Sequence, residues 1–248
     1  MKRDTVKQLL VETSLSQEES VTLTGKEYHY LCRVRRVKVG EVIELKDSSE
    51  KRYNCRILEI KEDSCLIEVG ELIQSHIRPY DIHLYLCLCK GKKTDLMIRQ
   101  ATETGVRSIT LLDSDFSQVK LKEESREDHK YERWRKIIKE AQQQSGSYIN
   151  TMLNPLIKFK DLPEIQSDHT IGFFCHQEKL GPSQLADIGK GYNDIHMIIG
   201  SEGGLSSGEI EILKKKGYSS LFLGDNVLRA ETASLFALAA IMTTMEIT

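Results

Sequence analysis

The chain has 248 residues, with 35 basic and 37 acidic side chains and a formal net charge of −2 at pH 7. Because the charges nearly cancel, the whole molecule has no cationic field that would drive nonspecific binding to nucleic acid, and an RNA partner would need local basic patches. The N-terminal twenty residues lack the apolar run of a signal peptide, and no stretch of ~18 apolar residues occurs. The sequence therefore predicts a soluble, cytoplasmic protein without a membrane segment.

Short runs in which apolar and polar residues alternate dominate the first 74 residues. They are Val21–Thr24, Glu41–Leu45, Tyr53–Ile60 and Cys65–Val69. A period of two is typical of strands that bury one face. Residues 1–74 are therefore predicted to form a small antiparallel sheet or barrel, linked to a second domain by Gln74–Tyr80, which contains Pro79.

The remaining residues, 75–248, alternate between apolar strand-like runs and helical patterns. Strands are predicted at Ile82–Cys89, Ile109–Leu112, Thr170–Cys175 and Ile195–Ile199, and helices at Asp95–Thr104 and Tyr131–Gln144. Strands that alternate with helices favour a parallel sheet covered by helices on both faces. The second domain is thus predicted to be of the α/β class.

The cysteines give no sign of a metal site or of a disulfide framework. They are Cys32, Cys55, Cys65, Cys87, Cys89 and Cys175, and no two of them have C-x-x-C spacing. Four of the six lie in apolar strand-like runs. We therefore expect reduced core cysteines and no bound metal.

A glycine-rich turn, Gly200-Ser201-Glu202-Gly203-Gly204, follows the predicted strand Ile195–Ile199. It has neither the spacing of a dinucleotide fingerprint nor the lysine of a P-loop. Glycines permit positive φ angles and a close approach of a ligand to the backbone. Ser206 and Glu209 form a capping-box pattern, so a helix is predicted to begin near Ser206. A tight strand–helix connection is the alternative explanation of the glycines.

A second turn, GDNVLRAETA from Gly224 to Ala233, lies less than thirty residues further on and opens an apolar helix. Because ligands in open α/β sheets bind at the carboxyl edge of the strands, the two turns are predicted to flank one pocket. The alternative for Arg229 and Glu231 is a structural ion pair, with Glu231 placed favourably at a helix N-terminus.

The pattern GSEGGLSxxE followed by LGxxVLRAETA resembles the RsmE-type RNA methyltransferases of the SPOUT superfamily, in which GPEGG and LGxRILRTETA are common. Ser201 stands in place of the proline, Asn226 in place of an arginine and Ala230 in place of a threonine. Three earlier segments also resemble the family: His29–Arg36 with the following Val39-Gly40-Glu41, Lys93–Val106, and Arg133–Ser145. Ser147 stands where that last motif usually has an arginine. The resemblance covers nearly the whole chain.

This resemblance implies methylation of N3 of a uridine in small-subunit ribosomal RNA, with S-adenosylmethionine as the cofactor. It implies an α/β fold with a SPOUT-type parallel sheet, a C-terminal trefoil knot from Ile195 to about Met242, and a small N-terminal β-barrel (PUA-like) domain that binds RNA. A homodimer is also implied, with ribosomal RNA or the assembled small subunit as the partner. The helix Ser234–Met242 is apolar on most sides, which suits burial against a second subunit or within one.

The same resemblance places the cofactor against the two turns, whose glycines and leucines suit apolar contact and main-chain hydrogen bonds to adenine. The expected cofactor-binding residues are Ile199, Gly200, Ser201, Glu202, Gly203, Gly204, Leu223, Gly224, Val227, Leu228, Arg229, Thr232 and Ala233.

Methylation of N3 requires help in removing the imide proton of uridine. Arg229 is the predicted stabiliser of negative charge on the base, and Glu231 or Glu202 the predicted proton acceptor. Each glutamate has an alternative role, because Glu231 could only cap the helix and Glu202 could only order the turn. His176, at the end of a predicted strand, is a weaker candidate.

Two basic patches are candidates for RNA contact, although a solvated surface is the simpler explanation of either patch alone. The predicted RNA-binding residues are His29, Arg33, Arg35, Arg36, Lys92 and Lys93. Two other functions stay open: a SPOUT enzyme that methylates a transfer-RNA base or a ribose 2′-hydroxyl, and a noncatalytic RNA-binding ribosome-assembly factor.

Overall fold

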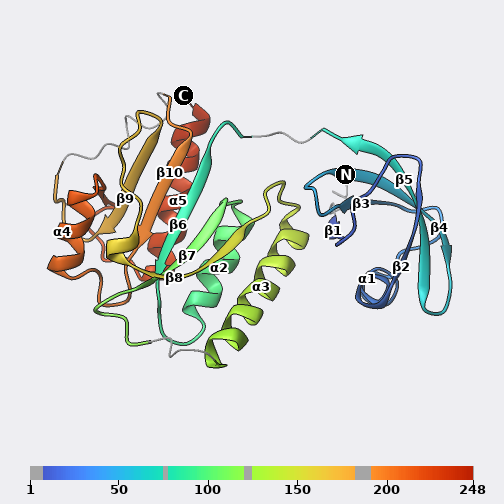
Figure 1. The fold of residues 1–248 in the computed structure, drawn as a ribbon, viewed down its shortest axis with the longest axis horizontal. Coiled ribbons are helices and arrows are strands. Elements are labelled where there is room, and N and C mark those ends of the chain that lie inside the picture. The colour runs from blue at the N-terminus through green and yellow to red at the C-terminus, as the bar shows by residue number, and fades with distance from the viewer. Residues whose placement is uncertain (1–7, 75–77, 120–124, 182–190, 248) are drawn as a thin grey trace. The chain divides into compact units, whose positions relative to one another are not determined.

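The computed structural model describes residues 8–74, 78–119, 125–181 and 191–247. The chain divides into two compact units (Figure 1). The first consists of Met1–Ile77 together with Gln142–Tyr148, and the second of Arg78–Ala141 together with Ile149–Thr248. A short segment from the middle of the chain thus belongs to the N-terminal unit. None of the described helices is long and apolar enough to cross a membrane.

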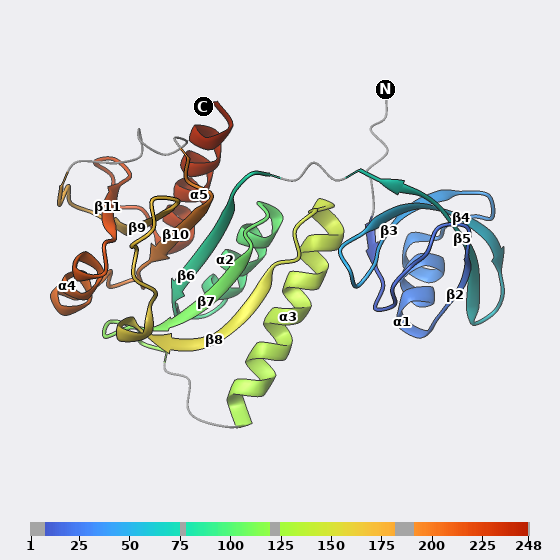
Figure 2. The same cartoon turned by 45° about the horizontal axis from the view of Figure 1, so that its top comes forward.

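The first unit is built on a five-stranded sheet with the order β1-β3-β4-β5-β2. Its strands are β1 (Gln8–Leu10), β2 (Ser20–Thr24), β3 (Val42–Lys46), β4 (Arg52–Ile60) and β5 (Ser64–Ile73). The predicted antiparallel pairing holds for β2 with β5, β3 with β4 and β4 with β5, whereas the short strand β1, which the sequence reading missed, pairs in parallel with β3. The sheet curls around a helical segment (Figure 2).

That helical segment carries the predicted RNA-binding residues His29, Arg33 and Arg35, and Arg36 follows it directly. It consists of α1 (Gly25–Tyr28) and the π-helix η1 (His29–Arg35). Tyr28 and Leu31 are buried in the core of the sheet and Tyr30 packs against it, whereas His29, Arg33 and Arg36 are exposed. The sequence reading did not identify this helix, because two buried residues in eleven are too few to show a helical period.

The segment 142–148 is held to the sheet of the first unit by buried polar contacts. Lys46 is fully buried, and its Nζ donates hydrogen bonds to the carbonyl oxygens of Tyr148 (2.7 Å) and Ser147 (3.4 Å). The Arg52 guanidinium stacks 3.8 Å from the centre of the Tyr148 ring and pairs with Glu44. Ser147, the site of a missing family arginine, therefore contributes its backbone to this arrangement.

The second unit contains a six-stranded sheet with the order β11-β9-β10-β6-β7-β8, and every recorded strand pair in it is parallel. The strands are β6 (Asp81–Cys87), β7 (Ser108–Asp113), β8 (Met152–Lys158), β9 (Thr170–His176), β10 (Asp194–Ile199) and β11 (Ser219–Phe222). The predicted parallel sheet is confirmed. Strand β8 was missed, because Pro155 lowers the strand signal of this run, and β8 accordingly lies at an edge of the sheet.

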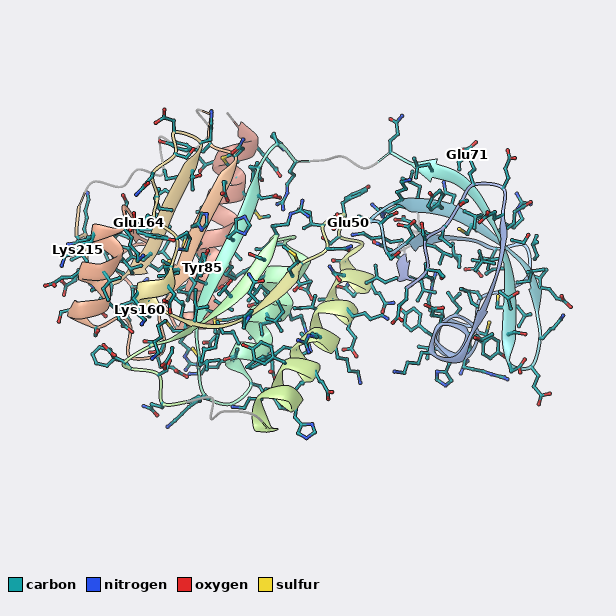
Figure 3. All side chains as sticks on the ribbon, in the orientation of Figure 1. Glu50, Glu71, Tyr85, Lys160, Glu164 and Lys215 are labelled. Atoms are coloured by element: carbon teal, nitrogen blue, oxygen red, sulfur yellow. The ribbon has the colours of Figure 1, made fainter. Side chains whose placement is uncertain are left out.

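Helices cover both faces of this sheet, as predicted. The helices α2 (Lys93–Glu103), α3 (Ser125–Ser145) and α5 (Ala230–Ile247) contribute to a core with Leu84, Leu86 and Met197. On the other face, α4 (Ser207–Lys215) and the 3-10 turn η2 (Phe159–Asp161) pack with Tyr85 and Cys87. Tyr85, labelled in Figure 3, lies on the central strand β6.

Candidate active site

The predicted meeting of the two turns is confirmed. A cavity of about 610 Å³ lies where β9, β10 and β11 end, which is the carboxyl edge expected to hold a ligand in an open parallel sheet. Its lining residues are Lys93, Cys175, His176, Gln177, Ile199, Gly200, Ser201, Glu202, Gly203, Gly204, Leu205, Leu223, Gly224, Asn226, Val227, Leu228, Arg229, Ala230 and Ala233.

The first turn is closed by its own hydrogen bonds. The Gly204 N–H donates to the Ser201 carbonyl oxygen (2.9 Å), and the Ser201 hydroxyl donates to the Gly204 carbonyl oxygen (3.3 Å). A Cβ on Gly200 would lie 3.0 Å from the Gly204 carbonyl carbon, and Gly204 has a φ of +75°. Both positions therefore favour glycine, one for space and the other for backbone conformation.

The predicted capping box is confirmed at the start of α4. The Ser206 hydroxyl accepts a hydrogen bond from the Glu209 N–H (3.2 Å), and the Glu209 carboxylate accepts one from the Ser206 N–H (2.7 Å). The other Glu209 oxygen accepts a hydrogen bond from the Asp115 N–H (2.8 Å). The helix start thus also holds the loop that follows β7.

Glu202 joins the first turn to the start of α2. One of its oxygens accepts hydrogen bonds from the Lys90 N–H and from Lys93 Nζ, both at 3.0 Å. Partial burial raises the pKa of Glu202, but hydrogen bonds from Lys93 and from backbone N–H groups outweigh it, and the net pKa is below the ordinary value. The same ion pair raises the pKa of Lys93. Glu202 is thus a stable carboxylate at neutral pH.

The second turn leaves its polar side chains available. Gly224 has a φ of +116°, and residues 224–227 are exposed. Arg229 is exposed and lines the cavity, and the described part of the chain gives its guanidinium no hydrogen bond or ion pair. Glu231 lies in the first turn of α5 and outside the cavity lining, with one buried carboxylate oxygen that has no hydrogen-bond partner among the described residues.

Residues at the end of β9 complete the cavity beside the two turns, and of these the sequence predicted only His176 as a site candidate. Cys175, His176 and Gln177 line the cavity there. Burial raises the pKa of the Cys175 thiol to about 12, so it is protonated and a poor nucleophile. All six cysteines are free, and the four in strand-like runs are buried, as predicted.

Twelve of the thirteen residues predicted for the cofactor line the cavity, and Thr232 is the exception, because it is exposed on α5 outside the lining. Of the predicted catalytic residues, Arg229 and Glu202 line the cavity and Glu231 adjoins it in sequence. Lys93, predicted as an RNA contact, also lines the cavity. Its partner Glu202 is 109 residues away in the sequence, so local patterns carry no signal for this pair.

The predicted RNA contacts of the first unit lie along η1. His29, Arg33 and Arg36 are exposed, whereas Arg35 is half-buried, and burial lowers its pKa despite the opposing effects of Tyr30 and Glu41. The Arg33 guanidinium donates to the Glu62 carbonyl oxygen (3.0 Å). In the second unit, Lys92 is exposed at the start of α2. Two exposed arginines and an exposed histidine thus lie along η1 and its C-cap.

Comparison with known proteins defines the class of this molecule. Residues 76–242 match the RNA methyltransferase domain family, and residues 23–70 match the RNA methyltransferase PUA domain family. The first match covers more than half of the chain, so the chain belongs to this family of RNA methyltransferases and has the PUA domain that accompanies it.

The relatives narrow the comparison further. The chain is 30% identical to Ribosomal RNA small subunit methyltransferase E of Aquifex aeolicus, over 88% of this chain and 91% of that protein. It is 29% identical to Ribosomal RNA small subunit methyltransferase E 2 of Borreliella burgdorferi, over 93% and 94%. Among solved structures, that of a Ribosomal RNA small subunit methyltransferase E from Neisseria gonorrhoeae bound to S-adenosyl methionine has the same fold, with a TM-score of 0.85, 24% identity and coverage of 96% and 97%.

Proposed function

We propose that this protein transfers a methyl group from S-adenosylmethionine to N3 of a uridine in small-subunit ribosomal RNA. The observation that carries the proposal is the cavity formed by both turns, with an arginine on its wall that has no partner among the described residues, in a member of an RNA methyltransferase family. Relatives named for small-subunit ribosomal RNA, and a similar fold solved with S-adenosyl methionine, support the choice of cofactor and substrate.

The residues of the cavity fit this cofactor. Its volume of about 610 Å³ lies within the range of sites for small molecules and cofactors. Ile199, Leu223 and Leu228 offer apolar contact, and the backbone of residues 200–204 and 223–228 offers main-chain hydrogen bonds for an adenine ring. Because Gly200, Gly203 and Gly204 have no side chains, the cofactor can approach the backbone of the first turn closely. We assign to this site the twelve predicted cofactor-binding residues that line the cavity, which are all thirteen except Thr232.

The bound cofactor supplies an electrophilic methyl group, which passes from sulfur to N3 as the carbon–sulfur bond breaks and S-adenosylhomocysteine is released. Before that transfer, N3 must lose its proton, and the negative charge spreads over the two carbonyl oxygens of the ring. The guanidinium of Arg229, which the described residues leave without a partner, is the donor on the cavity wall that can stabilise this charge. Its planar shape offers two parallel N–H donors to such an anion.

The two candidate proton acceptors differ in their environment. Glu202 already accepts two hydrogen bonds, and its lowered pKa makes it a weak base. Glu231 follows the cavity-lining Ala230, and one of its carboxylate oxygens has no hydrogen-bond partner among the described residues. We therefore assign the ordering of the first turn to Glu202, which leaves Glu231 as the candidate proton acceptor.

RNA binding is assigned to the exposed side chains of η1 and its C-cap, His29, Arg33 and Arg36, with Arg35 in support, and to Lys92 near the cavity. We extend the proposal to the knotted topology and to a homodimer. Two neighbouring apolar residues of α5, Leu235 and Phe236, are 37% and 53% exposed, which suits contact with a second subunit. Light scattering on wild type and Phe236→Asp is the test: a wild-type molar mass near the 28.3 kDa of one chain would contradict the dimer, and an equally dimeric variant would contradict the role of this surface.

Nucleoside mass spectrometry of ribosomal RNA is the decisive test of the reaction. Small subunits from a strain that lacks the gene are incubated with the purified protein and S-adenosylmethionine, and the digested RNA is compared with an untreated sample. The proposal expects 3-methyluridine to appear only in the treated sample. Appearance of another methylated base or a 2′-O-methyl ribose would replace the substrate assignment. Binding of RNA without any methylated nucleoside would indicate a noncatalytic factor.

A further inference from the structure

Phe116 is an exposed aromatic residue in the loop that follows β7. Its side chain is 49% exposed, although a phenyl ring is ordinarily more buried. Exposure of a single apolar side chain needs no explanation by itself. The surroundings of Phe116 distinguish it from the other exposed apolar residues.

Hydrogen bonds hold the loop on both sides of Phe116. The preceding residue, Asp115, accepts a hydrogen bond from the Ser206 hydroxyl (2.6 Å), and its N–H donates to Glu209 (2.8 Å). The following residue, Ser117, donates from its hydroxyl to the Leu88 carbonyl oxygen (2.9 Å). The ring is thus presented from a fixed backbone, which lowers the entropic cost of ordering it around a ligand.

The same anchors place Phe116 beside the cavity. A Cβ on Gly203, which lines the cavity, would lie 2.9 Å from Phe116 Cβ, so the Phe116 side chain occupies the space directly beside the first turn. Leu88, whose carbonyl oxygen holds Ser117, lies two residues before Lys90 and shortly before Lys92 and Lys93. Of these lysines, Lys90 and Lys92 are exposed. A fixed aromatic face, the cavity turn and two exposed cations therefore occupy one edge of the sheet.

We propose that Phe116 is a stacking platform for the nucleobase that flanks the reacting nucleotide in the bound RNA. Single-stranded RNA is held by aromatic side chains that stack on its bases, together with cations that contact its phosphates. Phe116 lies outside the cavity lining, so it receives the neighbouring base while the target base enters the cavity. This inference rests on the proposed function and adds to it a residue that positions the RNA strand.

Binding of a ten-nucleotide oligouridine in the presence of S-adenosylhomocysteine tests the stacking directly. Phe116→Ala and Phe116→Leu are each expected to weaken binding about 5- to 150-fold, the range typical of one lost stacked base. Phe116→Trp is expected to keep the affinity, and RNA should quench its added fluorescence. The single native tryptophan, Trp134, is buried and provides a constant background.

A second readout uses methylation of small ribosomal subunits. Phe116→Leu should raise KM for the subunits while kcat and the affinity for S-adenosylmethionine stay within twofold of wild type. Met152→Ala is the matched control, because Met152 is similarly exposed (54%) and lies at the amino end of the edge strand β8, the end of the sheet opposite to the cavity, and the change should alter neither RNA binding nor KM. Thermal unfolding of each variant verifies that the loop substitution leaves the fold intact.

Several outcomes would overturn the inference. If Phe116→Leu binds the oligonucleotide and the subunits as wild type does, the ring does not stack on RNA. If Phe116→Ala changes the molar mass in light scattering and leaves RNA affinity unaltered, the ring contacts protein. These results leave the proposed function intact when wild type still methylates RNA, whereas a wild type that methylates no RNA overturns both.

Discussion

The two turns that line the cavity are held by the protein in different ways. The first is closed by hydrogen bonds between Ser201 and Gly204, tied to α2 through Glu202, and followed at once by a capped helix. The second exposes residues 224–227, with Val227 77% exposed, and ends in an arginine without a protein partner among the described residues.

This contrast separates shape from chemistry within one site. A turn that is closed by its own hydrogen bonds is preformed, and it offers a ligand a fixed surface. A guanidinium without a protein partner can instead place its donors on charge that develops during a reaction. The first turn is therefore assigned to holding the cofactor. The second turn contributes its backbone and apolar side chains to the same cofactor site, and its Arg229 is assigned to acting on the base.

Replacing Arg229 by lysine has the largest expected effect on this comparison. Lysine keeps the positive charge but loses the planar pair of donors. Turnover at neutral pH is expected to fall about 10²–10³-fold, the range for loss of one preorganised donor, while the affinity for S-adenosylmethionine changes little. Single-turnover methylation and calorimetry measure the two effects separately. Loss of cofactor binding in proportion to turnover would make Arg229 part of the holding surface.

Replacing the arginines of η1 and its C-cap tests whether the RNA affinity comes from the first unit or from the two turns of the cavity. With Arg33, Arg35 and Arg36 all replaced by glutamine, the slope of log K against log salt should fall by about 2, at ~0.7 for each phosphate contact with a single strand. Cofactor affinity should not change. The matched control replaces Lys160, Lys214 and Lys215, exposed near and on α4 (Figure 3 labels the first and last), and should leave the slope unaltered. Equal slopes for both triple variants would assign η1 to ordinary solvated surface.

Gly204→Ala tests how far the first turn depends on its backbone. An L-residue at a φ of +75° costs roughly 1–2 kcal/mol, and asparagine tolerates this region better than alanine does. Urea unfolding should show that loss for Gly204→Ala and a smaller one for Gly204→Asn. Gly208→Ala is the control, because Gly208 lies inside α4 with room for a methyl group, and the change should stabilise the protein by up to about 1 kcal/mol. Equal stability of Gly204→Ala and wild type would show that the turn is loosely held.

The smallest effect is expected from Glu202→Gln. The folded-state pKa of Glu202 is lowered, so its ionised form contributes stability above the unfolded-state value, near pH 4.5, and that contribution disappears as the pH falls through the folded-state value. The ion pair is partly exposed, so the contribution is below about 1 kcal/mol. Unfolding free energies of wild type and Glu202→Gln should differ at pH 7 and converge below pH 4. A constant difference across this range would show that the carboxylate charge is irrelevant to the turn.

Sequence patterns predicted the structural features that depend on residues close together in the sequence. The cap at Ser206, the parallel strands of the second unit and the meeting of both turns at one edge follow from short-range chemistry and from the rules of α/β sheets. Strand β8 was hidden by Pro155, and β1 has only three residues, too few for a detectable alternation. The positive φ angles within the turns fall at Gly204 and Gly224, which the sequence cannot distinguish from Gly200 and Gly203.

Contacts between distant segments were beyond the sequence. Lys93 looked like a member of a basic patch, but it pairs with Glu202 inside the cavity. The loop around Phe116 is held by hydrogen bonds between residues far apart in the sequence. Ser117 bonds to Leu88, 29 residues away, and Asp115 bonds to Ser206 and Glu209, which are each about ninety residues away. Such pairs form only after the sheet has assembled, because its topology decides which loops meet.

The most direct test of the division between the turns is the pH dependence of single-turnover methylation by wild type and by Arg229→Lys, both with saturating S-adenosylmethionine. If Arg229 stabilises the anion of the base, the variant should recover part of its lost rate as the pH rises, because N3 then ionises with less help from the protein. Its rate should therefore climb more steeply with pH than that of wild type. Parallel profiles, together with a weakened affinity for the cofactor, would contradict the assignment and place both turns in the same holding role.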